Sequence, residues 1–119
     1  MVPSGGAPFK SATFARRVIR DQAGMSYGIS GDLAKSRSMF EKGIVDDPSY
    51  PLNYYNLACA DAGEKKLSDA RLHLQQAFDR KANVNPGETM PVPTEDDSFL
   101  PYKDNREFWT FLQGLKAGK

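Results

Sequence analysis

The sequence holds a single cysteine, Cys59, among its 119 residues. One cysteine excludes an intrachain disulfide, a CxxC redox pair and a metal site built from several thiolates. Long apolar runs are missing as well, because no stretch of about 18 apolar residues occurs and the segment after Met1 lacks the apolar core of an export signal. We therefore expect a soluble chain with neither a membrane span nor an uncleaved export signal. The compartment stays undetermined.

β-Branched residues are also scarce. Val, Ile and Thr together number 12, against 21 for Ala plus Leu, which disfavours sheet and favours helix. An excess of one charge is lacking too, since 16 basic residues face 15 acidic ones and the formal net charge is +1. No overall field attracts the chain to nucleic acid or to an anionic membrane. The composition predicts one small all-α domain with neither of these partners.

The chain divides into a short leading segment and one domain. Residues 1–10 contain the Pro, Gly and Ser typical of a flexible linker, and residues 11–119 form the predicted domain. Residues 9–20 are basic and free of acids, as transit peptides are, but their apolar spacing favours the first helix of the domain. Apolar residues recur at helical spacing in five segments, namely 11–27, 32–47, 50–61, 67–81 and 104–116.

Capping residues mark the ends of these segments. Ser11, Asp32, Ser49 and Asp104 are good N-cap types, and Gly63 is a good C-cap type. Asp104 is followed three residues later by a glutamate, which completes a capping box. Proline or glycine separates each helix from the next. The first four helices come in pairs, and each pair is expected to be antiparallel.

Residues 83–101 interrupt the helical pattern with four prolines and four acids. This segment is long for a connection within a compact domain, and it is either a true loop or an extended strap docked on the helices. The helix predicted after it carries Phe108, Phe111, Leu112 and Leu115 on one face. An apolar face of that size must be buried against the preceding helices.

The four earlier helices form two copies of one unit. A shift of 34 residues aligns segment 17–50 with segment 51–84 without a gap, and self-similarity at this period is typical of a helical solenoid. In the first copy, repeat positions 8, 11, 20, 24, 27 and 32 hold Gly24, Tyr27, Ser36, Phe40, Gly43 and Pro48. In the second copy, positions 4, 7, 8, 20, 24 and 27 hold Tyr54, Leu57, Ala58, Ala70, Leu74 and Ala77.

This pattern resembles the tetratricopeptide repeat (TPR), whose signature is W-x2-L-G-x2-Y, then A-x3-F, then P. Small residues at positions 8, 20 and 27 let paired helices approach closely, while large residues fill the space between them. Asp61 departs from the signature at a core position, which requires a polar partner for its carboxylate. The resemblance implies a right-handed superhelical array of about five helices, with segment 104–116 as the capping helix.

The residues offer little for catalysis or for cofactor binding. Cys59 and His73 lie on different predicted helices, one among alanines and the other on a polar stripe, so we interpret them as a small packed thiol and a surface imidazole. The acidic run 95–97 lacks the alternating oxygens of a calcium loop, and no glycine-rich phosphate loop occurs. We expect no catalytic residue, no metal site and no cofactor, and the chain is predicted not to be an enzyme.

The family resemblance implies a concave groove lined by the first helix of each pair, where a segment of a partner protein lies. The matching positions are Val18, Asp21, Met25 and Gly28 in the first copy, and Leu52, Tyr55, Cys59 and Ala62 in the second. Met25, Leu52 and Tyr55 are expected to bury apolar side chains of the partner, and Asp21 to select a basic or hydrogen-bond-donating neighbour.

A subset of the family binds carboxylate tails of chaperones through one lysine and two asparagines. Only Asn56 matches that set, because Asp21 and Met25 occupy the other two positions. An aspartate facing a carboxylate repels it, so binding of such tails is not expected.

Two functions follow from these observations. The first is a non-catalytic protein interaction module that binds a peptide segment of an unidentified partner protein in the groove. The groove residues are Val18, Asp21, Met25, Leu52, Tyr55, Asn56 and Cys59. The alternative is a structural domain that docks onto another copy or onto an upstream domain, because two repeats are fewer than a stable stack usually needs. The chain is expected to be a monomer or a weak homo-oligomer.

Overall fold

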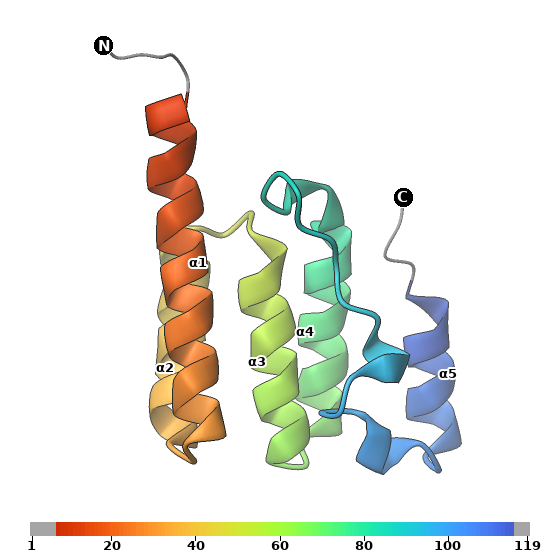
Figure 1. Cartoon of the computed structure of the whole chain (residues 1–119). Coiled ribbons are helices and arrows are strands. Elements are labelled where there is room, and N and C mark those ends of the chain that lie inside the picture. The colour runs from red at the N-terminus through yellow and green to blue at the C-terminus, as the bar shows by residue number, and fades with distance from the viewer. Residues whose placement is uncertain (1–6, 116–119) are drawn as a thin grey trace.

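The computed structural model describes residues 7–115, and within that range the chain is all-α, without strands. The first four helices reverse direction one after another and stand side by side as two antiparallel pairs, while the fifth helix runs in the same direction as the fourth because the segment between them descends along the array (Figure 1). The first pair is α1 and α2, the second is α3 and α4, and α5 packs beyond α4. The five helices are α1 (Ala7–Ile29), α2 (Leu33–Asp46), α3 (Pro51–Gly63), α4 (Leu67–Asp79) and α5 (Arg106–Gly114).

The helix boundaries follow the sequence signals closely at α2 and less closely elsewhere. Asp32 caps α2 as predicted, because its carboxylate accepts a hydrogen bond from the backbone N–H of Lys35. At α3, Pro51 is the first helical residue as expected, but Tyr50 is the N-cap in place of the predicted Ser49. Tyr50 makes no side-chain cap, so the fixed φ of the proline sets the start of this helix.

Three further boundary predictions are wrong, by one residue at the C-cap of α3 and at the N-cap of α5, and by four residues at the start of α1. Gly63 is the last residue of α3, and the left-handed residue that turns the chain afterwards is Lys65, with φ 63°. The N-cap of α5 is Asn105 and not Asp104, since the Asn105 side chain accepts from the backbone N–H of Phe108. The first helix begins at Ala7, four residues before Ser11. Residues 7–10 of the predicted linker 1–10 therefore belong to α1, and residues 1–6 lie outside the described residues.

Small residues let the two helices of the first pair pack closely against each other. A Cβ on Gly24 would lie 2.6 Å from Cε1 of Phe40, so only glycine lets the buried Phe40 ring reach the α1 backbone. Ser36 fills the next contact, and its hydroxyl donates to the carbonyl of Gly24 at 2.7 Å. Gly43 of α2 likewise leaves space for the Asn53 side chain of α3, with which a Cβ on Gly43 would collide. The small positions predicted from the 34-residue pattern are therefore the places where helices come closest.

The second pair repeats this arrangement with alanine in place of glycine. Ala58 of α3 faces Ala70, Leu74 and Ala77 of α4, and all four side chains are buried in one cluster. These residues stand at the same repeat positions as Gly24, Ser36, Phe40 and Gly43. The two pairs thus use one packing scheme with different side-chain volumes.

Asp61 is completely buried, and it has the partners that its burial requires. Arg37 of α2 donates to Asp61 Oδ1 at 2.7 Å, and Nδ1 of His73 lies 2.6 Å from Oδ2. Arg37 also contacts Glu64 at 3.3 Å. These contacts join α2, α3 and α4. His73 therefore has a buried polar partner and is not the free surface imidazole expected from the sequence.

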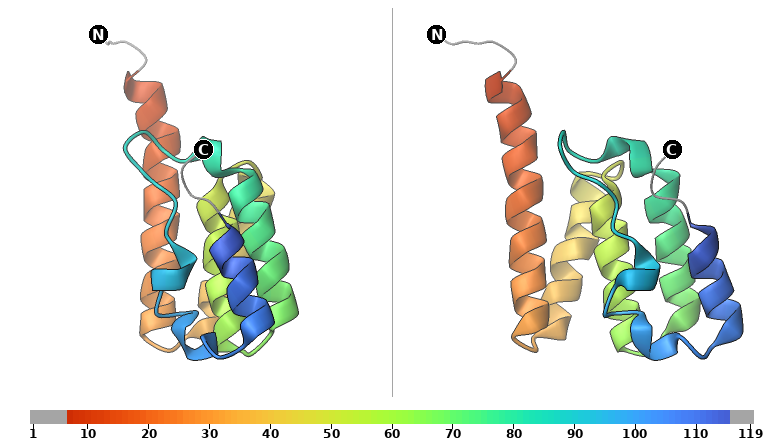
Figure 2. Two further views of the ribbon diagram at one scale, coloured as in Figure 1. Left: turned by 90° about the vertical axis from the view of Figure 1, so that its right-hand side faces the viewer. Right: turned by 45° about the vertical axis from the view of Figure 1, so that its right-hand side comes forward.

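Residues 84–99 form a docked strap, which decides between the two sequence interpretations of segment 83–101. The strap leaves the end of α4 and descends along α3, between α1 and α5 (Figure 2). Met90 and Phe99 are buried in the core, and the Tyr50 hydroxyl donates to the Glu88 carboxylate at 2.8 Å. At the upper end, Arg17 donates to the side chain of Asn85 at 3.1 Å.

The strap brings α5 back against the array. Phe99 contacts Tyr55 of α3 edge-on at 6.0 Å between ring centroids, and it lies at the same distance from Phe108 of α5. Leu112 is buried beside them. The burial predicted for the aromatic face of this helix is confirmed, and the short helices η2 (Pro93–Glu95) and η3 (Leu100–Tyr102) complete the path.

The first helix is longer than its neighbours. At 1.5 Å per residue its 23 residues extend well beyond the 14 residues of α2, so the early turns of α1 have no helix beside them (Figure 1). Among the described residues, no helix has the length and apolar character required to cross a membrane.

Candidate functional site

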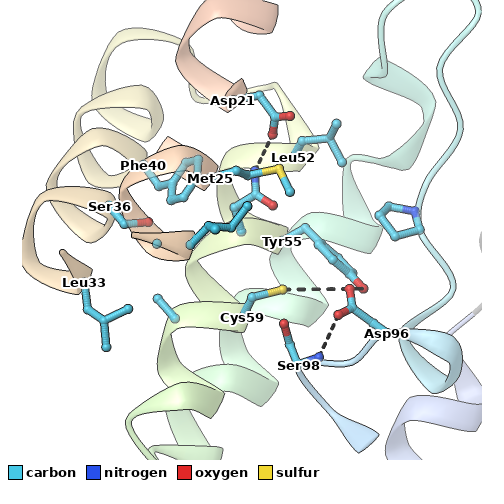
Figure 3. Close-up of a pocket in the computed structure, with 15 residues that line it drawn as sticks. Asp21, Met25, Leu33, Ser36, Phe40, Leu52, Tyr55, Cys59, Asp96 and Ser98 are labelled. Atoms are coloured by element: carbon cyan, nitrogen blue, oxygen red, sulfur yellow. Dashed lines mark hydrogen bonds between the residues drawn. The ribbon is translucent and has the colours of Figure 1, made fainter. Parts of the chain in front are cut away.

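A pocket of about 400 Å³ opens between α1, α3 and the strap, on the side where the groove was expected (Figure 3). Its walls come from α1 and α2 on one side and from the strap on the other, with α3 as the floor. Fifteen residues line it, namely Asp21, Met25, Gly28, Ile29, Leu33, Ser36, Phe40, Leu52, Tyr55, Asn56, Cys59, Ala60, Pro91, Asp96 and Ser98.

Six of the seven groove residues predicted from the sequence line this one pocket. They are Asp21, Met25, Leu52, Tyr55, Asn56 and Cys59. The seventh, Val18, is half-buried on α1 one turn before Asp21 and does not line the pocket. The positions implied by the family resemblance therefore include six residues that lie up to 38 positions apart in the chain and line one pocket.

The apolar wall of the pocket is open to solvent on the α1 side. Met25 is 48% exposed, Ile29 is 85% exposed and Leu33 is 44% exposed. Leu52 of α3 continues this surface into the pocket (Figure 3). Exposed apolar side chains that converge on one concavity are a typical feature of binding sites.

Asp21 stands at the upper end of the pocket, and one of its two carboxylate oxygens accepts a hydrogen bond (Figure 3). Its Oδ1 accepts from the side-chain amide of Asn56, and Oδ2 has no donor among the described residues. Burial raises the pKa of this carboxyl, although the Asn56 hydrogen bond acts in the opposite direction. No cation pairs with Asp21 in the described part of the chain.

Tyr55 does not present the exposed aromatic surface that the sequence suggested. It is only 2% exposed, because the strap covers it and Phe99 packs against its ring. Its hydroxyl donates to Asp96 Oδ2 at 2.7 Å, and burial raises its pKa far above the usual range. Tyr55 therefore fixes the strap to α3. The exposed apolar side chains of the pocket that a partner can contact are Met25 and Ile29 instead.

The strap contributes three pocket residues that the sequence reasoning missed: Pro91, Asp96 and Ser98. Asp96 is held by two donors, since Oδ1 accepts from the backbone N–H of Ser98 at 2.8 Å and Oδ2 accepts from Tyr55. The acids and prolines of segment 83–101 were the available signal. Helical periodicity gives no position for such an extended segment.

Cys59 lies on the floor of the pocket as a protonated thiol. Burial raises its pKa to about 12, and the negative charge of nearby Asp96 acts in the same direction. Its Sγ lies 4.0 Å from Asp96 Oδ2. His73 contacts Asp61 instead, so no thiol and imidazole come together here. Within residues 7–115, no group of three or more metal-ligating side chains is clustered.

A second, polar cavity of about 360 Å³ lies beside the projecting part of α1, lined by Thr13, Arg16, Arg17, Arg20, Asp46 and Asp47. Its basic residues are largely neutralised within the cavity. Arg17 pairs with Asp47 at 2.6 Å, and Arg20 pairs with Asp46 at 3.1 Å. Two of the three arginines therefore already have carboxylate partners.

Comparison of this chain with protein-family models, with curated proteins and with solved structures gives no match. The case for a function therefore rests on the geometry of the pocket and on the helix-pair pattern.

Proposed function

We propose that this chain is a TPR-like, non-catalytic protein interaction module that binds a segment of a partner protein in the pocket between α1, α3 and the strap. The observation that carries the proposal is the convergence of exposed Met25, Ile29 and Leu33 on one concavity. Water-exposed apolar side chains gain most from a partner that covers them together.

The helix-pair pattern supports the same proposal. Gly24 and Ala58 occupy equivalent repeat positions, and each lies where its helix pair packs most closely. That arrangement agrees with the TPR pattern, in which the first helix of each pair lines the concave side, and α1 and α3 both contribute residues to the pocket. The strap forms the other wall of the pocket through Pro91, Asp96 and Ser98.

The test is a selection of random peptides displayed on phage against the wild-type chain and against the double variant Met25→Gln, Ile29→Gln. Both residues are exposed and glutamine is a good helix former, so the variant is expected to fold as the wild type does. Peptides that bind the wild type and lose at least about tenfold in affinity for the variant, equivalent to about 1.4 kcal/mol, support the proposal. Failure to select any peptide contradicts it.

The matched control is Ile19→Gln, Val45→Gln on the outer side of the first helix pair. Ile19 and Val45 are 66% and 78% exposed, and each is adjacent in sequence to one member of the Arg20 and Asp46 ion pair. Peptides bound in the pocket are unaffected by this change. Peptides lost only with the control variant place the binding surface outside the pocket and contradict the proposal.

The exposed pair Ile19 and Val45 also supports a second candidate function, in which the outer face of α1 and α2 docks onto another copy or onto an upstream domain. Sedimentation velocity over a range of concentrations tests the first form of this candidate. A mass that rises with concentration for the wild type but not for Ile19→Gln, Val45→Gln supports self-association through this face. A monomer at every concentration contradicts it.

A further inference from the structure

The pocket has a charge pattern that narrows the choice of partner. Asp21 and Asp96 both line it, and none of its fifteen residues is a lysine, an arginine or a histidine. Glu88 of the strap lies close enough to Asp21 to raise the pKa of that carboxyl further. The concave side of the described chain therefore carries three carboxylates around a largely apolar surface.

The arginine one helical turn from Asp21 already has a carboxylate partner of its own. Arg17 lies one helical turn before Asp21, and it already donates to both oxygens of Asp47 and stacks on the Tyr50 ring at 4.3 Å. Glu88 accepts only neutral donors, namely the Tyr50 hydroxyl and the backbone and side chain of Asn85. Arg17 lies close enough to Glu88 for their charges to interact, whereas Asp21 and Asp96 form no ion pair with any described cation.

The carboxylates differ in whether an oxygen is free to accept a hydrogen bond from a ligand. Both oxygens of Asp96 are already engaged by Tyr55 and Ser98, so Asp96 contributes its charge more than a free acceptor. Asp21 Oδ2, in contrast, has no donor and belongs to a pocket-lining side chain. A half-buried carboxylate of this kind gains from a cationic donor more than an exposed one does, because the surrounding medium screens the pair less.

The apolar wall begins one helical turn further along α1. Met25 follows Asp21 by four residues and Ile29 follows Met25 by four, so the three side chains share one helix face. A ligand that reaches Asp21 with a cation therefore places its neighbouring atoms against Met25 and Ile29. The Asp21 carboxylate and the apolar side chains of Met25 and Ile29 therefore follow one another along the same face of α1.

We propose that the pocket selects a partner segment that carries one arginine or lysine next to an aliphatic residue, with the basic side chain donating to Asp21 Oδ2 and the aliphatic one packing against Met25 and Ile29. This inference rests on the proposed function and specifies its partner. Acidic segments are rejected by the same three carboxylates. Binding weakens as salt is added, since the pair is partly exposed.

The experiment uses the phage-selected peptides described above. Their sequences are expected to be enriched in arginine or lysine beside leucine, isoleucine or valine. One selected peptide is then synthesised together with a copy whose basic residue is replaced by methionine, and both are titrated into the wild-type chain by fluorescence anisotropy. The substitution in the peptide is expected to weaken binding by about tenfold or more.

The same titration is repeated on Asp21→Asn and on the matched control Asp97→Asn. Asp97 is an exposed strap acid that does not line the pocket. Asp21→Asn keeps the side-chain volume and an oxygen for Asn56, and it is expected to weaken the basic peptide about tenfold while leaving the methionine copy unchanged. Asp97→Asn is expected to change neither.

The outcomes separate this inference from the proposed function. Selected peptides that depend on Met25 and Ile29 but show no basic preference, or that bind Asp21→Asn as tightly as the wild type, overturn the inference and leave the proposed function standing. A selection that yields no pocket-dependent peptide overturns both. The methionine copy of the peptide keeps the test decisive even if Asp21→Asn fails to fold.

Discussion

Asp61 Oδ2 and His73 Nδ1 lie 2.6 Å apart in the interior between α3 and α4, and the Asp61 carboxylate has no exposed surface. Burial alone would raise the pKa of Asp61, but the hydrogen bonds from His73 and Arg37 outweigh it and hold the pKa below its usual value. The three side chains tie α2, α3 and α4 together through one carboxylate.

This arrangement predicts how stability changes with pH. Because the folded-state pKa of Asp61 is lower than the unfolded value of about 3.9, its contribution is fully present above that value. The contribution is lost as the pH falls through the folded-state pKa. Asp61→Asn is expected to lower the free energy of unfolding by about 3 kcal/mol at pH 7. It is also expected to make the free energy of unfolding depend less on pH in the acid range. Urea denaturation from pH 7 to pH 2 measures both effects, and equal slopes below pH 4 for the two proteins would contradict the account.

Gly24→Ala tests the close contact inside the first helix pair. The new Cβ would collide with the buried Phe40 ring, so we expect a loss of about 2 kcal/mol despite the gain in helix propensity. Gly63→Ala is the matched control, because nothing lies within 4 Å of a Cβ at that position. Its stability is expected to equal or slightly exceed that of the wild type. Thermal denaturation of the three proteins makes the comparison.

Phe99→Ala tests whether the strap belongs to the core. Phe99 is fully buried against Tyr55 and Phe108, so its truncation is expected to cost about 3 to 5 kcal/mol and to expose residues 84–99 to limited proteolysis. Val92→Ala serves as the control, since Val92 is largely exposed on the same segment. Equal stability of the two variants would show that the strap is only loosely attached.

Cys59 gives a chemical test of the pocket floor. With its pKa raised to about 12 by burial, almost no thiolate is present at pH 8, and the thiolate is the reactive form. We expect alkylation by iodoacetamide to be at least about 100-fold slower in the native protein than in urea, as followed by mass spectrometry. Similar rates in both states would mean that the thiol is not protected.

The fold could be predicted from the sequence to the extent that helical periodicity determines it. The 34-residue repeat placed Gly24, Ser36 and Phe40 correctly, because the small and large residues themselves create the close contacts. The helix caps were less certain. Asp104 and Asn105 are adjacent residues that both make good N-caps, and tertiary packing decides which one the helix uses.

The sequence predicted the part of the candidate site that lies on helices, but not the part that lies on the strap. The family resemblance supplied the groove positions on α1 and α3, and the helical period puts Asp21 and Met25 on one face of α1. Asp96 and the burial of Tyr55 depend on where the strap docks, and an extended segment without periodicity carries no such information. Long-range aromatic contacts, such as that between Tyr55 and Phe99, decide its position instead.

The central claim is that a protein segment binds in the pocket between α1, α3 and the strap. The most direct measurement is a titration of the isotope-labelled chain with a phage-selected peptide, followed through its backbone amide NMR signals. The account predicts that the largest shifts fall on Met25, Ile29, Leu52 and Asn56, with little change at Ile19 and Val45. Shifts concentrated at Ile19 and Val45, or no shifts at saturating peptide, would contradict it.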